Sequence, residues 1–143
     1  MRTVSEKTTV TERRPRGLLD TCVVIDLPLI ARERLPLEAA VSSVVLAELA
    51  QGVAMTGDPV EILARAERLA DTEAAFTAIP FDREAARRFG TLVALTIKAQ
   101  RNPRPRRMDL MIAATAAAQG LPLYTRNADD FKGLEQAVEI IPV

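Results

Sequence analysis

Three carboxylates in this chain stand alone in long apolar segments. Asp20 closes a short apolar run that begins at Gly17. Glu48 is the only charged residue in residues 39–56, and Asp109 is the only one in residues 108–125. Because an unpaired carboxylate is costly to bury, each of these side chains needs a capping role, a polar partner or a cation.

Each carboxylate also has an ordinary structural explanation. Asp20 and Asp109 both precede a predicted helix, where an aspartate commonly caps the first turn. Glu48 needs only one exposed stripe on its helix to reach water. Taken one at a time, these explanations are as good as a catalytic or metal-binding role, so the choice depends on whether the carboxylates meet in the fold.

The composition limits the chemistry that the chain can perform. With 143 residues, 48% hydrophobic and 27% charged, it has the profile of one globular domain. It has no histidine and one cysteine, which removes the commonest general base, the usual zinc ligands and an internal disulfide framework. Only 3% of residues are aromatic, so binding of single strands by base stacking has little support.

The N-terminal region differs from the rest of the chain. Residues 1–16 are polar and aperiodic, and we expect a flexible tail there, followed by one domain over residues 17–143. No apolar run reaches the length of roughly 18 residues that a membrane span needs. The N-terminus lacks the apolar segment of a secretory signal. These features predict a cytoplasmic protein without membrane contact.

Strands and helices alternate in the remaining sequence. This alternation predicts an α/β fold, in which a central, mostly parallel sheet lies between two layers of helices. The predicted strands lie near residues 17–19, 39–43, 77–81, 121–124 and 138–143, and the main predicted helices cover residues 44–53, 60–75, 83–100 and 110–118. The last of these helices has almost no polar position and should be buried all round.

The strand order brings the acidic residues together. In an open parallel sheet, sites form outside the C-terminal ends of the strands. Asp20 follows the first strand, Glu48 lies in the helix after the second, and Asp109 opens a helix whose N-terminus faces the same edge. The polar segment 125–131, with Asp129 and Asp130, follows the fourth strand.

Such a group of negative charges must take up protons or bind a cation. Oxygen ligands favour a hard ion such as Mg²⁺ or Mn²⁺. An ion of this kind suits phosphodiester hydrolysis, because it polarises the phosphate and activates water without a histidine.

A basic segment lies directly before Asp109. Residues 101–107 contain two prolines and four arginines: Arg101, Arg104, Arg106 and Arg107. Arginine forks match phosphate oxygens, so this loop, together with Arg126, is a candidate phosphate-binding surface. Exposed arginine-proline loops are also common, and the sequence supports both interpretations equally.

Four motifs in this order give the chain a resemblance to the PIN domains, and within them to the VapC-type toxins of bacterial toxin–antitoxin pairs. The motifs are LLDTCVVI, SSVVLAELAQGV, MDLMIAATAAAQGLPLYT and TRNADDF, and the resemblance covers residues 17–143. It implies a PIN-like α/β/α domain and an endoribonuclease that depends on Mg²⁺ or Mn²⁺ and cuts structured RNA such as tRNA or rRNA.

The resemblance also implies roles for individual residues. The family's first three acidic positions fall on Asp20, Glu48 and Asp109. Its fourth falls on Asn127, an amide where a carboxylate often stands, and Asp129 could supply the missing charge. Asp130 is then expected to hold the loop.

The resemblance further implies a VapB-like antitoxin as partner, a homodimer, and a hetero-oligomer with the antitoxin. The amphipathic segments 60–75 and 83–100 either form a groove for an antitoxin helix or belong to the core. Two alternatives to the nuclease stay open. One is a PIN-like scaffold that binds RNA or protein without turnover, because Asn127 weakens the metal site. The other is a receiver-like domain with an acidic Mg²⁺ pocket.

Overall fold

A computed structural model describes residues 13–143 of the chain. Residues 1–12, which make up most of the expected N-terminal tail, lie outside the described residues. Residues 13–16 belong to the fold, so the expectation that they are part of a flexible tail is wrong. Arg13 donates from Nε to the Leu35 carbonyl at 3.0 Å, Arg14 forms an ion pair with Glu139, and Arg16 begins the first strand.

The fold is built on a five-stranded sheet in which every described pairing is parallel. The strands are β1 (Arg16–Leu19), β2 (Glu38–Ser42), β3 (Thr77–Ile79), β4 (Leu123–Thr125) and β5 (Ile140–Pro142), and their order is β3-β2-β1-β4-β5. In the central register Leu19 lies opposite Val41 on one side and Tyr124 on the other. This arrangement confirms the predicted α/β class with a parallel sheet.

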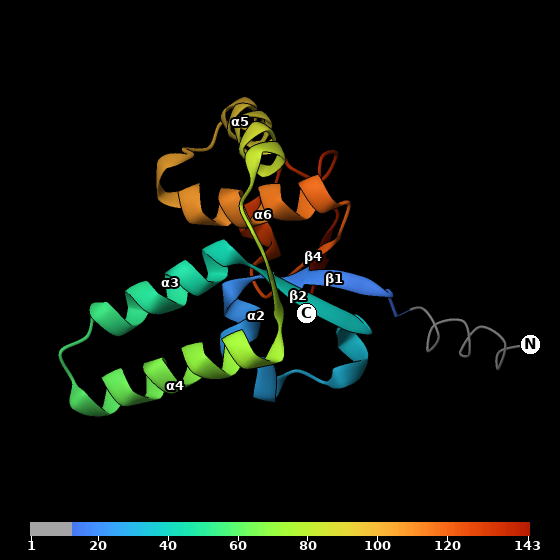
Figure 1. The fold of residues 1–143 in the computed structure, drawn as a ribbon. Coiled ribbons are helices and arrows are strands. Elements are labelled where there is room, and N and C mark those ends of the chain that lie inside the picture. The colour runs from blue at the N-terminus through green and yellow to red at the C-terminus, as the bar shows by residue number, and fades with distance from the viewer. Residues whose placement is uncertain (1–12) are drawn as a thin grey trace, which may run out of the picture.

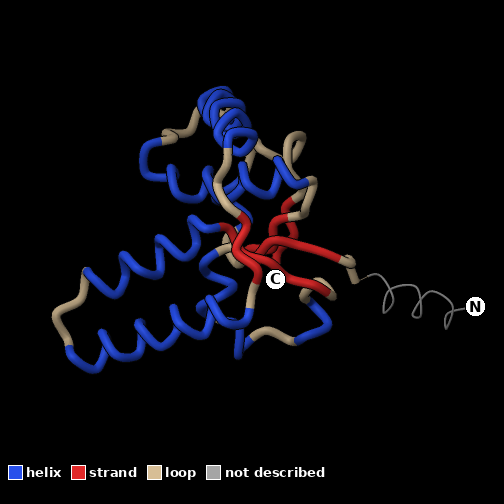
Figure 2. Tube along the Cα trace, viewed as in Figure 1, coloured by secondary structure: helices blue, strands red, loops and turns tan. Residues whose placement is uncertain are grey.

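Two groups of helices cover the sheet, as Figures 1 and 2 show. Helices α5 (Arg83–Lys98) and α6 (Arg107–Gln119) pack on each other on one side. On the other side, Figure 1 shows α2 (Thr21–Ile25) and α4 (Pro59–Ala75). Helix α3 (Ser43–Ala54) packs on α4, and the two extend away from the sheet as a helical hairpin.

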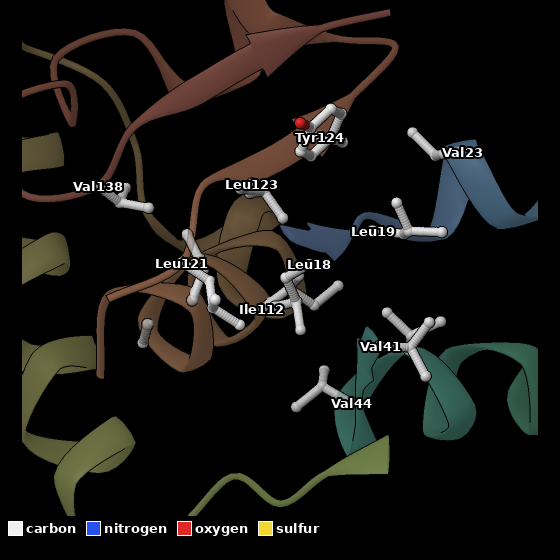
Figure 3. Packing of buried hydrophobic residues seen from close by; sticks show 14 of the residues in the cluster. Leu18, Leu19, Val23, Val41, Val44, Ile112, Leu121, Leu123, Tyr124 and Val138 are labelled. Carbon is white, nitrogen blue, oxygen red and sulfur yellow. The ribbon is translucent and has the colours of Figure 1, made fainter. Parts of the chain in front are cut away.

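The core lies between the sheet and these helices. Its centre holds Leu18, Leu19, Val41, Ile112 and Leu123, none of which is accessible to water (Figure 3). Strands buried on both faces are apolar throughout rather than alternating, as the LL of β1 illustrates. Helix α6 is buried from Ile112 to Ala116, as its lack of a polar face predicts.

Two helix boundaries differ from the prediction. Helix α6 begins at Arg107 instead of Leu110, because a 3-10 turn (Arg104–Arg106) leads directly into it. Helix α5 ends at Lys98 instead of Gln100, because Gln100 has a left-handed backbone with φ of 62°.

A groove between segments 60–75 and 83–100, one of the two alternatives for these helices, does not form. Helix α4 packs on α3, whereas α5 packs on α6 on the other side of the sheet. Within residues 13–143, no helix combines the length and the apolar character needed to cross a membrane.

Candidate active site

Asp20 lies at the C-terminal end of β1 and caps α2. Its Oδ1 accepts a hydrogen bond from the Thr21 N–H at 2.8 Å, and its Oδ2 accepts one from the Thr125 hydroxyl at 2.8 Å. The residue is only 4% exposed. Burial raises the pKa of Asp20, and the hydrogen bonds from Thr125, Cys22 and Thr21 oppose that rise. Asp20 therefore both caps α2 and belongs to the acidic group.

Glu48 approaches the same region from α3. Its Oε1 accepts a hydrogen bond of 2.5 Å from the Thr21 hydroxyl. Burial raises the pKa of Glu48, the Thr21 hydroxyl lowers it, and the nearby charge of Asp20 raises it further. Thr21 thus joins two acidic residues: its N–H binds Asp20 and its hydroxyl binds Glu48.

Asp109 lies in the first turn of α6 rather than at its cap, which is Arg106. Among residues 13–143, no hydrogen bond or ion pair reaches its carboxylate, although the side chain is half-buried. Burial raises the pKa of Asp109 to about 7, with further contributions from the charges of Asp20, Glu48 and Asp130. Asp109 therefore lies close enough to the other acidic residues for their charges to repel its ionised carboxylate, as the predicted convergence requires.

The loop after β4 contributes Asp130 rather than Asp129 to this field. The Asp130 charge raises the pKa of both Asp20 and Asp109. The Asp129 side chain is 82% exposed and pairs with Arg101, with 3.6 Å between Nη2 and Oδ2. Asn127 is exposed, and its N–H donates to the Thr125 hydroxyl at 3.0 Å. In the structure, Asp130 rather than the expected Asp129 therefore lies in the field of the acidic group.

Four of the five arginines in the predicted phosphate-binding surface, all except Arg101, fall into two pairs. Arg106 and Arg126 are held by carboxylates: Arg106 Nη1 lies 3.4 Å from Asp130 Oδ1, and Arg126 Nε lies 3.2 Å from Asp26 Oδ2. Arg104 and Arg107 are exposed and form no ion pair with any residue in 13–143. Only the second pair presents its guanidinium groups to solvent without a competing carboxylate.

Three polar residues of the site were not identified from the sequence. Thr21, Cys22 and Thr125 surround Asp20, and the Cys22 thiol lies 3.3 Å from its Oδ2. Thr21 and Cys22 directly follow Asp20, so their adjacency was a usable sign. The contact of Thr125 with Asp20 spans 105 residues, and only the pairing of β1 with β4 reveals it.

The acidic group suits a hydrated divalent ion better than an enclosed one. Within residues 13–143, no three acidic or cysteine side chains are arranged to hold a metal ion on their own. Mg²⁺ commonly keeps several waters and binds through one or two carboxylates together with substrate phosphates. The Asp109 carboxylate, accessible and repelled by three neighbouring charges, fits that mode of binding.

Comparison with known proteins identifies the family of the chain. The PIN domain family matches residues 18–136. The chain is 38% identical over 135 residues to Ribonuclease VapC5 of Mycobacterium tuberculosis, an alignment that covers 89% of this chain and 95% of the relative.

Solved structures are similar over most of the chain. The crystal structure of VapBC-5 from Mycobacterium tuberculosis, a member of the VapBC family of toxin–antitoxin systems, matches with a TM-score of 0.76 and 34% identity. That match covers 90% of this chain and 99% of the other. The DNA-bound VapBC of Salmonella typhimurium matches with a TM-score of 0.67 and 26% identity, over 87% of this chain and 96% of the other. The chain therefore belongs to the PIN-domain family, and within it to the VapC-type toxins of VapBC toxin–antitoxin pairs.

Proposed function

We propose that this toxin is an endoribonuclease that hydrolyses RNA phosphodiester bonds with the help of Mg²⁺ or Mn²⁺, and that structured RNA such as tRNA or rRNA is its substrate. The observation that carries the proposal is the half-buried Asp109 carboxylate. It has no hydrogen-bond partner in residues 13–143 and lies in the field of Asp20, Glu48 and Asp130. The ribonuclease name of the relative VapC5 supports the same activity.

In this proposal the ion keeps several of its waters and would be bound by one or two of the carboxylates of Asp20, Glu48 and Asp109, together with the RNA phosphate. Asp130 adds the charge that we had expected from Asp129, and Asn127 offers an amide oxygen at the loop. The ion supplies Lewis-acid polarisation of the scissile phosphate and activation of water. Thr21 and Thr125 orient the carboxylates by donating to Glu48 and Asp20.

The exposed side chains of Arg104 and Arg107 are the proposed contacts to the RNA backbone. They flank the first turn of α6, which carries Asp109. An arginine without a carboxylate partner can bind phosphate without first breaking an ion pair. Arg126 would have to leave Asp26 before it could do so.

The activity is tested with Asp20→Asn and Asp109→Asn, which change one charged oxygen to an amide. We expect each variant to cleave RNA more slowly by about 100-fold or more in Mg²⁺, since the ion that would stabilise the developing charge on the phosphate is bound more weakly. Glu73→Gln, an exposed carboxylate on α4, is the matched control and should cleave like the wild type.

Sequencing of RNA 5′ ends after induced expression, beside Asp20→Asn, maps the cut sites. Products are expected to carry 5′-phosphate and 3′-hydroxyl ends. Unchanged cleavage by Asp20→Asn would contradict the proposal. RNA binding without metal-dependent turnover in the wild type would favour the alternative of a binding module, and labelling by acetyl phosphate would favour a receiver-like domain.

For the partner we propose a VapB-like antitoxin that places an amphipathic helix between α2 and α4. The structural neighbour VapBC-5 is itself a toxin–antitoxin complex. The cleft there has a volume of about 430 Å³, an apolar floor that includes Val24 and Phe76, and a polar rim that includes Glu67. This arrangement suits a helix docked in a groove. A homodimer and a hetero-oligomer with the antitoxin complete the proposed assembly.

A further inference from the structure

Two arginines of the basic segment reach across to the loop after β4. Arg101 donates from Nη1 to the Asp129 carbonyl at 2.5 Å, and its Nη2 lies 3.6 Å from Asp129 Oδ2. Arg106 donates from Nη1 to the Asp130 carbonyl at 3.1 Å, and the same nitrogen lies 3.4 Å from Asp130 Oδ1. Each arginine therefore binds the backbone and the side chain of one residue in a consecutive pair.

The two arginine side chains are partly removed from solvent. Arg101 is 21% exposed and Arg106 is 23% exposed, whereas Arg104 between them is exposed. A guanidinium that already binds a carbonyl and a carboxylate has fewer N–H groups left for phosphate. Spacing in the sequence placed all of these arginines in one group, but their contacts separate them.

The backbone conformation before Arg101 directs this residue toward Asp129. Helix α5 ends in a turn in which Gln100 has a left-handed backbone, and the Arg101 N–H donates to the Thr96 carbonyl at 3.0 Å. This turn directs the chain from α5 toward the loop after β4. Arg106 caps α6, three residues before Asp109. The two arginines thus connect the loop to the helix that carries Asp109.

We propose that Arg101 and Arg106 are positioning residues that hold Asp130 and the loop 127–131 beside Asp109, rather than contacts for RNA phosphates. The inference rests on the proposed nuclease function. It changes our sequence-based assignment of Arg106 and gives Arg101 a separate role. The buried ring of Phe131, 1% exposed, fixes one end of the loop. Arg106 holds Asp130, which contributes to the acidic group, and Arg101 holds the neighbouring Asp129.

The test compares Arg101→Ala and Arg106→Ala with Arg104→Ala, and uses Arg83→Ala, on the exposed start of α5, as the matched control. We expect the first two variants to lower kcat by about 10- to 100-fold and to leave KM within about twofold. Effects of this size are typical when a residue that orients a metal-binding side chain is removed. Arg104→Ala should instead weaken RNA binding. It should also reduce the slope of the logarithm of the RNA association constant against the logarithm of the salt concentration by about one, the value for one phosphate contact.

Two further measurements separate positioning from a general loss of structure. Arg106→Lys keeps a charge but not the planar fork, so it should restore activity only in part. In the Asp130→Asn background, Arg106→Ala should have a smaller effect than in the wild type, because the ion pair is already lost and only the hydrogen bond to the residue 130 carbonyl remains to be removed. Additive effects of these two substitutions, or a loss of RNA affinity in Arg106→Ala with unchanged kcat, would overturn the proposal.

The proposal can be tested even if the proposed nuclease function fails. Amide hydrogen exchange reports on residues 127–133, and titration with Mn²⁺ reports on the acidic group, neither of which requires turnover. Faster exchange and weaker Mn²⁺ binding in Arg101→Ala and Arg106→Ala, with Arg83→Ala like the wild type, support the positioning role. Exchange and Mn²⁺ affinity equal to those of the wild type would overturn it.

Discussion

Asp109 connects the charge of the site to the stability of the protein. Its carboxylate is half-buried near three other carboxylates, and its pKa is raised from 3.8 to about 7. Between these values the folded protein holds a proton that the unfolded chain has released. Protonation of one residue therefore couples the free energy of unfolding to pH.

We predict that, without metal ions, the free energy of unfolding falls as the pH rises from about 4 to about 7. Mg²⁺ should stabilise the protein more at about pH 8 than at about pH 5.5, because the ion binds the ionised carboxylate and competes with the proton. Urea unfolding at both pH values, with and without Mg²⁺, measures this effect. Asp109→Asn should have a weaker pH dependence, and an identical dependence in the two proteins would contradict the assignment.

At the level of single residues, the sequence was sufficient where a carboxylate stood alone in an apolar segment. Asp20, Glu48 and Asp109 were predicted for that reason, and all three lie in one electrostatic group. The choice between Asp129 and Asp130 was beyond the sequence. Both lie in one 3-10 turn (Ala128–Phe131), where neighbouring side chains point about 120° apart. Their directions depend on contacts with Arg101 and Arg106, far away in the chain.

At the level of elements, α6 illustrates how closely the helices approach the sheet. Ala113, Ala114 and Ala116 are fully buried, so small side chains face the core there. A hydrophobic stretch in the sequence was enough to predict a buried helix. Its start was misplaced by three residues, because the 3-10 turn before α6 contains a proline and two arginines and resembles a loop in sequence.

We predict that Ala114→Leu destabilises the protein by about 1 to 3 kcal/mol, because the added carbons have no space in a close-packed core. Ala118→Leu is the control, since Ala118 lies near the end of the same helix and is only half-buried. Urea unfolding of both variants measures the difference. Equal stabilities for the two leucine variants would show that the packing around Ala114 can adapt.

At the level of the whole molecule, the hairpin of α3 and α4 leaves much apolar surface in water. Leu63 is 70% exposed and Met55 is 74% exposed. The amphipathic pattern of segment 60–75 correctly indicated a helix, but not which helix it packs against. One of the two interpretations that the sequence left open placed α5 beside α4, whereas the parallel sheet places α5 on the opposite side.

We predict that Ala64→Glu, in the cleft between α2 and α4, prevents co-purification with the VapB-like antitoxin and leaves RNA cleavage unchanged. The longer, charged side chain would occupy the cleft and oppose docking of an apolar helix face. Ala66→Glu is the matched control, exposed on the same helix but outside the cleft lining. If both variants still bind the antitoxin as tightly as the wild type, the antitoxin docks elsewhere.

The place of β1 in the sheet has a consequence for synthesis of the toxin. β1 comes near the start of the chain but lies at the centre of the sheet, and Asp20 obtains its hydrogen bond from Thr125 only after β4 has paired with β1. A nascent chain therefore cannot assemble the acidic site until almost all of it has left the ribosome. Such long-range pairing is slow. The order of the strands thus delays completion of the acidic site, and with it the proposed nuclease activity, until synthesis of the chain is almost finished.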